Sequence, residues 1–350
     1  MSILHVTNGD SARVVLEQSG VPGTVIAWPD VLHEGPTPRA SGEEWIRVRS
    51  RYLASAGYGE PGASLDEVLR EYRRRDAALD SYAAHDEIVF WFEHDLFDQL
   101  LLIRHLWRIG APGVTGAARF SLVCGQDYLG LLMPDEFPPR FEARQPITAD
   151  QIRTGTRAWE AFTAADPMGL LPFSAAEHAH QAAAEHAEHS AAEHAEHAGH
   201  SAADHVDHAA ALPWLAGAIR RYLEEFPSTA TGLARSERQI LQVLSEGVRT
   251  PEETFVEASR LEDAIFMGDT SFWTIVRRLA GGPRPLVAAQ VQPRHGRLPA
   301  GTLALTADGG AVLSGRADHV ALNGLDRWLG GTHLTPARYW RWTGTTLINE

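Results

Sequence analysis

The chain has 350 residues, of which 44% are hydrophobic and 22% are charged, as is ordinary for a globular protein that folds unaided. Its formal net charge of -14 argues against a nonspecific nucleic-acid binder, because affinity for phosphates depends on clustered cations. The single cysteine, Cys124, excludes an internal disulfide and a multi-cysteine zinc site, and we expect a buried, unreactive thiol there. No apolar run reaches about 18 residues and the start lacks a signal-peptide pattern, so we expect a cytoplasmic protein with no membrane partner.

The first half of the chain alternates between strand and helix patterns. Strands are predicted for residues 3–7, 24–28, 88–92 and 117–124. Helices are predicted for residues 12–18, 41–51, 65–79, 100–109 and 152–165. This alternation predicts an α/β fold, a mostly parallel sheet flanked by helices with right-handed crossovers. We expect the two helices of residues 41–79 to cross back over the sheet and their arginines, Arg49 among them, to face solvent.

Acidic side chains follow several of these strands. The stretch IVFWFEHDLFDQ, residues 88–99, runs from a buried strand directly into Glu93, His94 and Asp95. The carboxyl ends of parallel strands meet at one edge of a sheet, where ligands of open α/β folds bind. We therefore expect seven acidic residues to converge there: Asp10, Asp30, Glu34, Glu93, Asp95, Asp98 and Asp127.

Residues 173–212 differ in composition from the rest of the chain. Nine histidines lie among alanines and acids, and AAEHAEHS at 183–190 is nearly repeated at 191–198. We interpret this segment as a His/Ala-rich low-complexity linker that is partly helical and solvated. The i,i+3 pairs His186/His189 and His194/His197 offer an alternative, loose chelation of a metal ion. The linker would separate an α/β domain, residues 1–172, from a second domain, residues 213–350.

The second predicted domain resembles a winged helix. Three helices are predicted from residues 236, 250 and 269, and two strands, 285–290 and 303–305, follow them. Residues 235–350 carry 13 arginines against 12 acidic residues, so the sequence argues against duplex DNA as a partner. Winged helices also contact proteins, and a protein partner is the alternative. The aromatic, glycine-rich tail is expected to pack back on a domain, where Asp326, Arg327 and His333 would complete the pocket at the strand ends.

A family resemblance rests on His5, Gly9-Asp10-Ser11, Asp30, Gly35-Pro36 and Asp98-Gln99. With these residues the first 130 or so positions resemble the bacterial domain-of-unknown-function family eighteen thirty-five. Glu93-His94-Asp95 departs from the pattern of that family. The resemblance implies the fold, its extent and a second C-terminal domain. It implies no reaction and transfers no catalytic residue.

The residues themselves suggest metal chemistry. Carboxylates at strand ends suit Mg²⁺ or Mn²⁺, and side chains at i and i+2 of an extended strand point the same way. The predicted metal ligands are Asp10, Asp30, Glu93 and Asp95. The candidate catalytic residues are His94, His33 and Glu34, with either histidine as a general base. A small anionic or nucleotide-like ligand would contact Asp10, Ser11, Asp98, Gln99 and Asp127.

Two classes of function stay open at this point. The first is metal-assisted phosphoester or nucleotide processing at the acidic strand-end pocket. The second is a non-catalytic module that senses a ligand or binds a protein through the winged-helix-like domain. The sequence lacks a phosphate-binding P-loop, a G-x-G-x-x-G turn, a G-x-S-x-G elbow and an H-E-x-x-H helix, which argues against ATPase, dinucleotide and zinc-protease functions.

Overall fold

A computed structural model describes residues 1–59, 62–111, 119–174, 208–294 and 297–350. The described chain forms two compact units, and it passes between them several times. The first unit takes its described residues from 1–29, 81–161 and 169–220. The second takes them from 30–80, 162–168 and 221–350. These units differ from the domains expected from the sequence, because residues 30–80 group with the C-terminal part of the chain. The histidine pairs of the linker lie outside the described residues.

A five-stranded sheet forms the centre of the first unit, in the order β2-β1-β4-β5-β6. Four strands are parallel, and β6 runs antiparallel to β5. The strands are β1 (Ile3–Thr7), β2 (Thr24–Ala27), β4 (Glu87–Glu93), β5 (Arg119–Gly125) and β6 (Gln145–Pro146). This mostly parallel sheet, flanked by helices, confirms the predicted α/β class.

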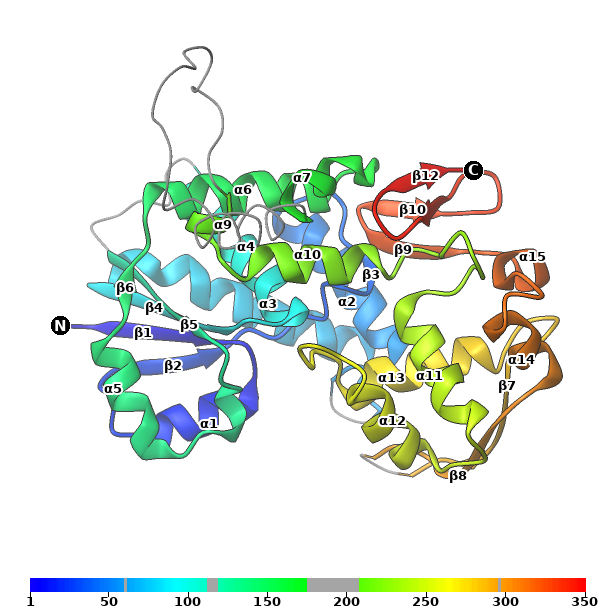
Figure 1. Ribbon diagram of the computed structural model, residues 1–350. Helices are drawn as coiled ribbons and strands as arrows, with labels where there is room; N and C mark the ends of the chain where they lie inside the picture. The colour runs from blue at the N-terminus through cyan, green and yellow to red at the C-terminus, as the bar shows by residue number, and fades with distance from the viewer. Residues whose placement is uncertain (60–61, 112–118, 175–207, 295–296) are drawn as a thin grey trace, which may run out of the picture. The chain divides into compact units, whose positions relative to one another are not determined.

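Helices cover both faces of this sheet. Those lying wholly or mostly in the first unit are α1 (Asp10–Gln18), α4 (Leu96–Gly110), α5 (Phe137–Glu142), α6 (Ala149–Phe162), α7 (Leu171–Ser174), α9 (His208–Ala211) and α10 (Leu215–Leu223). Figure 1 shows α1 and α5 on one side of the strands and α4 and α6 on the other. Short 3-10 turns occupy residues 81–84, 129–131, 134–136 and 167–170.

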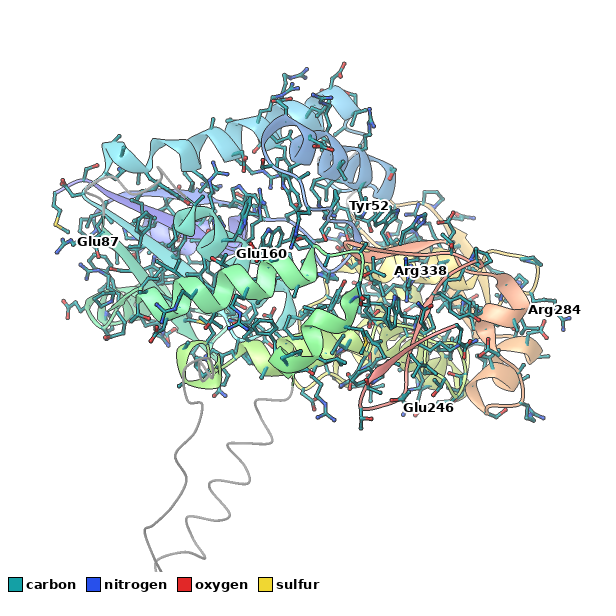
Figure 2. All side chains as sticks on the ribbon, turned by 90° about the horizontal axis from the view of Figure 1, so that it is seen from above. Tyr52, Glu87, Glu160, Glu246, Arg284 and Arg338 are labelled. Carbon is teal, nitrogen blue, oxygen red and sulfur yellow. The ribbon has the colours of Figure 1, made fainter. Side chains whose placement is uncertain are left out.

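The central strand β4 is apolar on both sides, as a strand covered on both faces requires. Successive side chains point to opposite faces. Trp91 packs against Phe137 of α5, with ring centroids 5.5 Å apart, while Phe90 packs against His105 of α4 at 5.1 Å. A glutamate lies at each end of this buried strand, Glu87 at the start, which Figure 2 labels, and Glu93 at the end. The apolar strand thus fixes two carboxylates inside the unit.

The second unit combines helices with small sheets. Its helices are α2 (Gly42–Ala56), α3 (Leu65–Asp80), α11 (Arg235–Ser245), α12 (Pro251–Ser259), α13 (Asp269–Leu279), α14 (Ala307–Leu313) and α15 (His319–Asn323). Its strands are β3 (Gly35–Pro36), β7 (Val287–Gln292), β8 (Ala300–Leu305), β9 (Arg327–Gly330), β10 (Thr332–Leu334), β11 (Trp340–Trp342) and β12 (Leu347–Asn349). The pairs β7–β8 and β11–β12 are antiparallel, and a third sheet has the order β10-β9-β3.

The C-terminal tail packs back on the chain, as expected. Strand β9 pairs in parallel with β3, so that Gly35 lies opposite Leu329 and Pro36 opposite Gly330. Gly330 has a φ of 58°, and a Cβ there would lie 2.4 Å from the carbonyl oxygen of Phe162, so the turn between β9 and β10 requires glycine. Among the described residues, no helix is both long and apolar enough to cross a membrane.

Candidate functional site

Three buried carboxylates lie together at the carboxyl end of β4, and we call them the acidic triad. Glu93 ends the strand, Asp95 is the N-cap of α4 and Asp98 lies in the first turn of that helix. Each offers an oxygen within 4.8 Å of the others. The chain moves from β1 to β2 on one side of β1 and returns through β4 on the other. The triad therefore lies at the topological switch point of the sheet, where ligands of open α/β folds bind.

A set of donors holds the triad in place. Asn8, directly after β1, donates through Nδ2 to Glu93 Oε1 at 2.9 Å and to Asp98 Oδ2 at 3.0 Å. The amide of Leu129 also donates to Glu93 Oε1, at 2.8 Å. The amide of Glu93 donates to Asp98 Oδ1 at 2.9 Å, and that of Asp98 donates to Asp95 Oδ1 at 3.1 Å. Adjacent strands and a helix start thus fix the three side chains.

The electrostatics of the triad disfavour three negative charges. Burial raises the pKa of Glu93, Asp95 and Asp98, and the neighbouring carboxylates raise the pKa of Asp95 and Asp98 further. The pKa of Asp95 reaches about 7. Protons or a bound cation would relieve the repulsion within such a cluster. Its donor set consists of oxygens, which suits Mg²⁺ or Mn²⁺ better than metals that prefer nitrogen or sulfur ligands.

The residues beside the triad have different roles. Gln99 donates through Nε2 to the carbonyl oxygen of Glu93 at 2.7 Å and thereby supports the end of the strand. Burial raises the pKa of Cys124 to about 12, so the sulfur stays a thiol. The ring of His94 lies near Tyr128 and Trp214, with centroids 5.7 and 5.8 Å away. Burial lowers the pKa of His94, which keeps the imidazole neutral and able to accept a proton.

Several predicted site residues of the first unit are not members of the triad. Asp10 is exposed and pairs with Arg13 at 2.9 Å, and Ser11 is exposed beside it. Asp127 is exposed and pairs with Arg140 at 2.6 Å. Neither Asp10 nor Asp127 belongs to the group of carboxylates whose oxygens lie within 4.8 Å of one another, so these two acids do not extend the cluster. Exposed acids near an arginine gain more from solvent and an ion pair than from burial beside other carboxylates.

Asp30 belongs to the second unit and is neutralised there. Its Oδ1 lies 2.6 Å from Arg49 Nη2, both side chains are fully buried, and Tyr72 donates to its Oδ2 at 2.8 Å. Although burial acts to raise the pKa of Asp30, the charge and hydrogen bonds of Arg49 hold that pKa below its usual value. Asp30 thus has a structural partner, and the expectation of a solvent-facing Arg49 is wrong.

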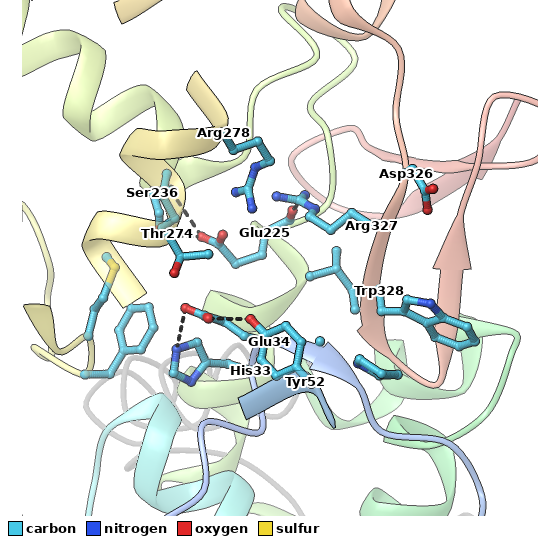
Figure 3. A pocket seen from close by; sticks show the side chains of 16 residues that line it. His33, Glu34, Tyr52, Glu225, Ser236, Thr274, Arg278, Asp326, Arg327 and Trp328 are labelled. Atoms are coloured by element: carbon cyan, nitrogen blue, oxygen red, sulfur yellow. Dashed lines mark hydrogen bonds and ion pairs between the residues drawn. The ribbon is translucent and has the colours of Figure 1, made fainter. Parts of the chain in front are cut away.

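His33 and Glu34 line a separate cavity, which lies inside the second unit (Figure 3). Glu34 Oε2 accepts hydrogen bonds from Tyr52 at 2.7 Å and Tyr58 at 3.1 Å. Burial acts to raise the pKa of Glu34, but His33 and the hydrogen bonds outweigh it and lower the pKa to about 2. Asp326 and Arg327 of the tail line this cavity and not the strand-end pocket that they were expected to complete, while His333 is not among the lining residues and pairs with Asp326 at 2.7 Å. The predicted catalytic residues therefore divide between the units, with His94 in one and His33 and Glu34 in the other.

Sequence reasoning missed two functional candidates. Asn8 is the first, and its position directly after a buried strand is the signal that it can reach the edge of the sheet. Arg278 lines the cavity from α13, and its pairing with Glu237, 41 residues earlier, leaves no local pattern. Comparison of the chain with protein-family models gives no match, and comparison with curated proteins gives none. The resemblance to family eighteen thirty-five stays a prediction.

Proposed function

We propose that the first unit binds Mg²⁺ or Mn²⁺ through Glu93, Asp95 and Asp98 and acts on the phosphoester of a small, nucleotide-like substrate. The observation that carries this proposal is the buried acidic triad at the switch point of the sheet, with oxygens within 4.8 Å of one another. A divalent cation neutralises the mutual repulsion of these carboxylates. When bound, it polarises a phosphoryl oxygen or lowers the pKa of a water molecule.

The surrounding residues supply the other elements of such a site. Asn8 and the amide of Leu129 orient Glu93, while Asn8 also orients Asp98. Helix α1 begins after Gly9 without a side-chain cap, so its first amides are available to a phosphate oxygen. His94, neutral at pH 7, is the candidate general base. These features support phosphate chemistry over hydride or acyl transfer.

Magnesium titration followed by thermal melting tests the proposal. A cation that binds the folded state stabilises it by about 1.4 kcal/mol at ten times its Kd, which raises the melting temperature of a cooperatively unfolding chain of 350 residues by roughly 2 °C. We expect this rise in the wild-type chain and its loss in Asp95→Asn. Asp127→Asn, which changes an exposed acid of the same unit, is the matched control and should respond as the wild type does. An equal rise in Asp95→Asn would show that magnesium binds elsewhere, for instance in the histidine-rich linker.

Hydrolysis of bis-p-nitrophenyl phosphate then separates a metal site from a metal-dependent enzyme. We expect Mn²⁺-dependent turnover in the wild type and in Asp127→Asn, and a loss of at least 100-fold in Asp95→Asn. His94→Gln should lower the rate without changing the magnesium-induced rise in melting temperature. Metal binding without any turnover would contradict the enzymatic part of the proposal and favour a sensing role.

A second function, protein contact, is proposed for the C-terminal part of the second unit. The order α11, α12, α13, β7, β8 resembles a winged helix. On α13, Arg278 pairs with Glu237 and Arg277 bonds to Thr274, so neither guanidinium is arranged for DNA phosphates. Large apolar side chains are exposed around α12 instead: Val248, Val256, Leu261 and Ile265. We expect no duplex-DNA binding in a polarisation titration at about 150 mM salt, and submicromolar binding would contradict this view.

A further inference from the structure

The cavity of the second unit has features that the proposed metal chemistry does not use. Its volume is about 260 Å³, below the range of roughly 300–1,000 Å³ that is typical of sites for drug-sized ligands. Residues from β3, α2, α11, α13 and β9 line it (Figure 3). A nucleotide is too large for this space, so its ligand belongs to a smaller class.

Apolar side chains form much of the cavity wall. Phe266, Met267 and Ile275 are buried on the side of α13 and the loop before it, and Leu329 is buried on β9. The ring of Phe266 meets that of His33 edge to face, with centroids 5.1 Å apart. This wall favours a ligand with an apolar part, because removing apolar surface from water drives binding.

A guanidinium group lies on one side of the cavity. Arg278 donates through Nε to Glu237 Oε1 at 3.0 Å and places Nη2 2.9 Å from the same oxygen. Arg327 Nη1 also lies 3.4 Å from that oxygen, so one carboxylate oxygen serves two guanidinium groups. Among the described residues, no acceptor bonds to Arg278 Nη1. The cavity therefore offers a cationic donor to a ligand.

Carboxylates also face this cavity. Glu225 accepts bonds at Oε1 from Arg221 Nη1, the amide of Ser236 and Ser236 Oγ. Its Oε2 accepts none from the described part of the chain. Glu34 Oε1 lies 3.6 Å from His33 Nε2, which is longer than a normal hydrogen bond. Burial acts to raise the pKa of Glu225, but Arg221 and Arg327 hold it below its usual value, so Glu225 and Glu34 are both ionised at pH 7.

We propose that this cavity binds a small α-amino acid with an apolar side chain. The ligand carboxylate would bond to Arg278, its ammonium group to Glu225, and its side chain would pack against Phe266, Met267 and Ile275. A phosphate fits poorly, because two ionised carboxylates would repel it. A hydrocarbon fits poorly too, since it would bury Arg278 and Glu225 without new partners. Arg278 and Glu225 already pair with Glu237 and Arg221, and a zwitterion would add a partner of opposite charge at Arg278 Nη1 and at Glu225 Oε2.

Isothermal titration calorimetry of the full chain without added metal tests this proposal. The probes are L-leucine, L-methionine and L-phenylalanine, with 4-methylpentanoate lacking the ammonium group and isoamylamine lacking the carboxylate. Adenosine, guanosine and inorganic phosphate complete the panel. We expect at least one amino acid to bind, and both single-charge analogues of leucine to bind at least tenfold more weakly than leucine if leucine is that ligand.

Two substitutions on α13 locate the binding. Thr274 lines the cavity, whereas Thr270 lies on the same helix outside it. Thr274→Ile should fill part of the space and weaken binding at least tenfold, and Thr270→Ile should bind as the wild type does. Glu225→Gln should weaken binding of the amino acid more than it weakens binding of 4-methylpentanoate. A general loss of structure would not produce this difference.

The outcomes that overturn the proposal are distinct. It fails if no amino acid in the panel binds to protein that melts cooperatively, or if a single-charge analogue binds as tightly as its amino acid. It also fails if a nucleoside or phosphate binds instead, or if Thr274→Ile binds as Thr270→Ile does. None of these results bears on the magnesium titration, because the triad and the cavity belong to different units.

Discussion

The two ends of β4 present a buried glutamate in opposite electrostatic surroundings. At the start, Glu87 accepts bonds from Ser121 Oγ at 2.7 Å and from Arg144 Nε and Nη2 at 2.8 and 3.0 Å. The hydrogen bonds of Arg144 lower the pKa of Glu87. At the end, Glu93 lies beside Asp95 and Asp98, and burial raises its pKa. One strand thus holds a neutralised carboxylate and a crowded one, six residues apart in sequence.

This difference shows that burial alone does not identify a functional acid. Glu87 and Asp30 are as buried as the triad, yet each has an arginine within 3 Å that completes its hydrogen bonds. Such pairs are structural, since their charges cancel inside the protein. The charges and hydrogen bonds that shift the pKa values of the triad come from carboxylates, backbone amides and Asn8. An unneutralised buried acid is costly to folding, which is why its surroundings point to a proton or a cation as the missing partner.

The largest expected difference between the two ends is in their pH dependence. The folded chain keeps a proton on Asp95 up to about pH 7, whereas the unfolded chain releases it near pH 4. The folded state therefore binds more protons in this window, and the free energy of unfolding should fall as pH rises from 4 to 7, by on the order of 4 kcal/mol. The lowered pKa of Glu87 has the opposite effect on the free energy of unfolding. Its contribution to stability is lost as pH falls below about 4.5.

Urea unfolding at several pH values, without metal, measures this effect. Asp95→Asn keeps an oxygen to accept the amide of Asp98 but cannot titrate, so its free energy of unfolding should fall less between pH 4 and 7 than that of the wild type. Asp127→Asn should keep the wild-type slope, because it lies on the surface of the same unit. Identical slopes for the wild type and Asp95→Asn would mean that the triad does not hold a proton.

A smaller effect distinguishes the two glutamates directly. Glu87→Gln removes the partner of Arg144 and should lower the free energy of unfolding by about 2 kcal/mol at pH 8, less than the ~3–5 kcal/mol of a fully buried pair, because Arg144 is 22% exposed. Glu93→Gln removes one of three crowded charges and should leave the free energy of unfolding unchanged or higher. Equal destabilisation by both substitutions, measured by urea unfolding, would remove the contrast between the two ends.

The sequence predicted the elements better than the residues that meet between them. The apolar run before Glu93 is enough to place the strand. Successive side chains of a strand point to opposite faces, so a run that is apolar at every position also indicates that both faces of the strand are covered. Asp98 returns to Glu93 because a helix starts at Leu96, so helix geometry, not strand geometry, completes the triad. Arg49 reaches Asp30 from 19 residues away, and no local pattern encodes that contact. Strand β3 has two residues, too few for a periodicity that would assign residues 30–80 to the second unit.

The smallest expected effect concerns Asp10, which follows β1 as Asp95 follows β4. Its side chain is 76% exposed and pairs with Arg13 on the same helix, and exposed pairs of this kind contribute about 0–1 kcal/mol. Asp10→Asn should therefore change the free energy of unfolding by less than about 0.5 kcal/mol and leave the magnesium-induced rise in melting temperature intact. A tenfold loss of magnesium affinity in Asp10→Asn would contradict the structure, because it would require a metal site that extends to the start of α1. If Asp10→Asn matches the wild type while Asp95→Asn loses the response, the cation is bound by the buried acids at the end of β4 and not by the acidic edge as a whole.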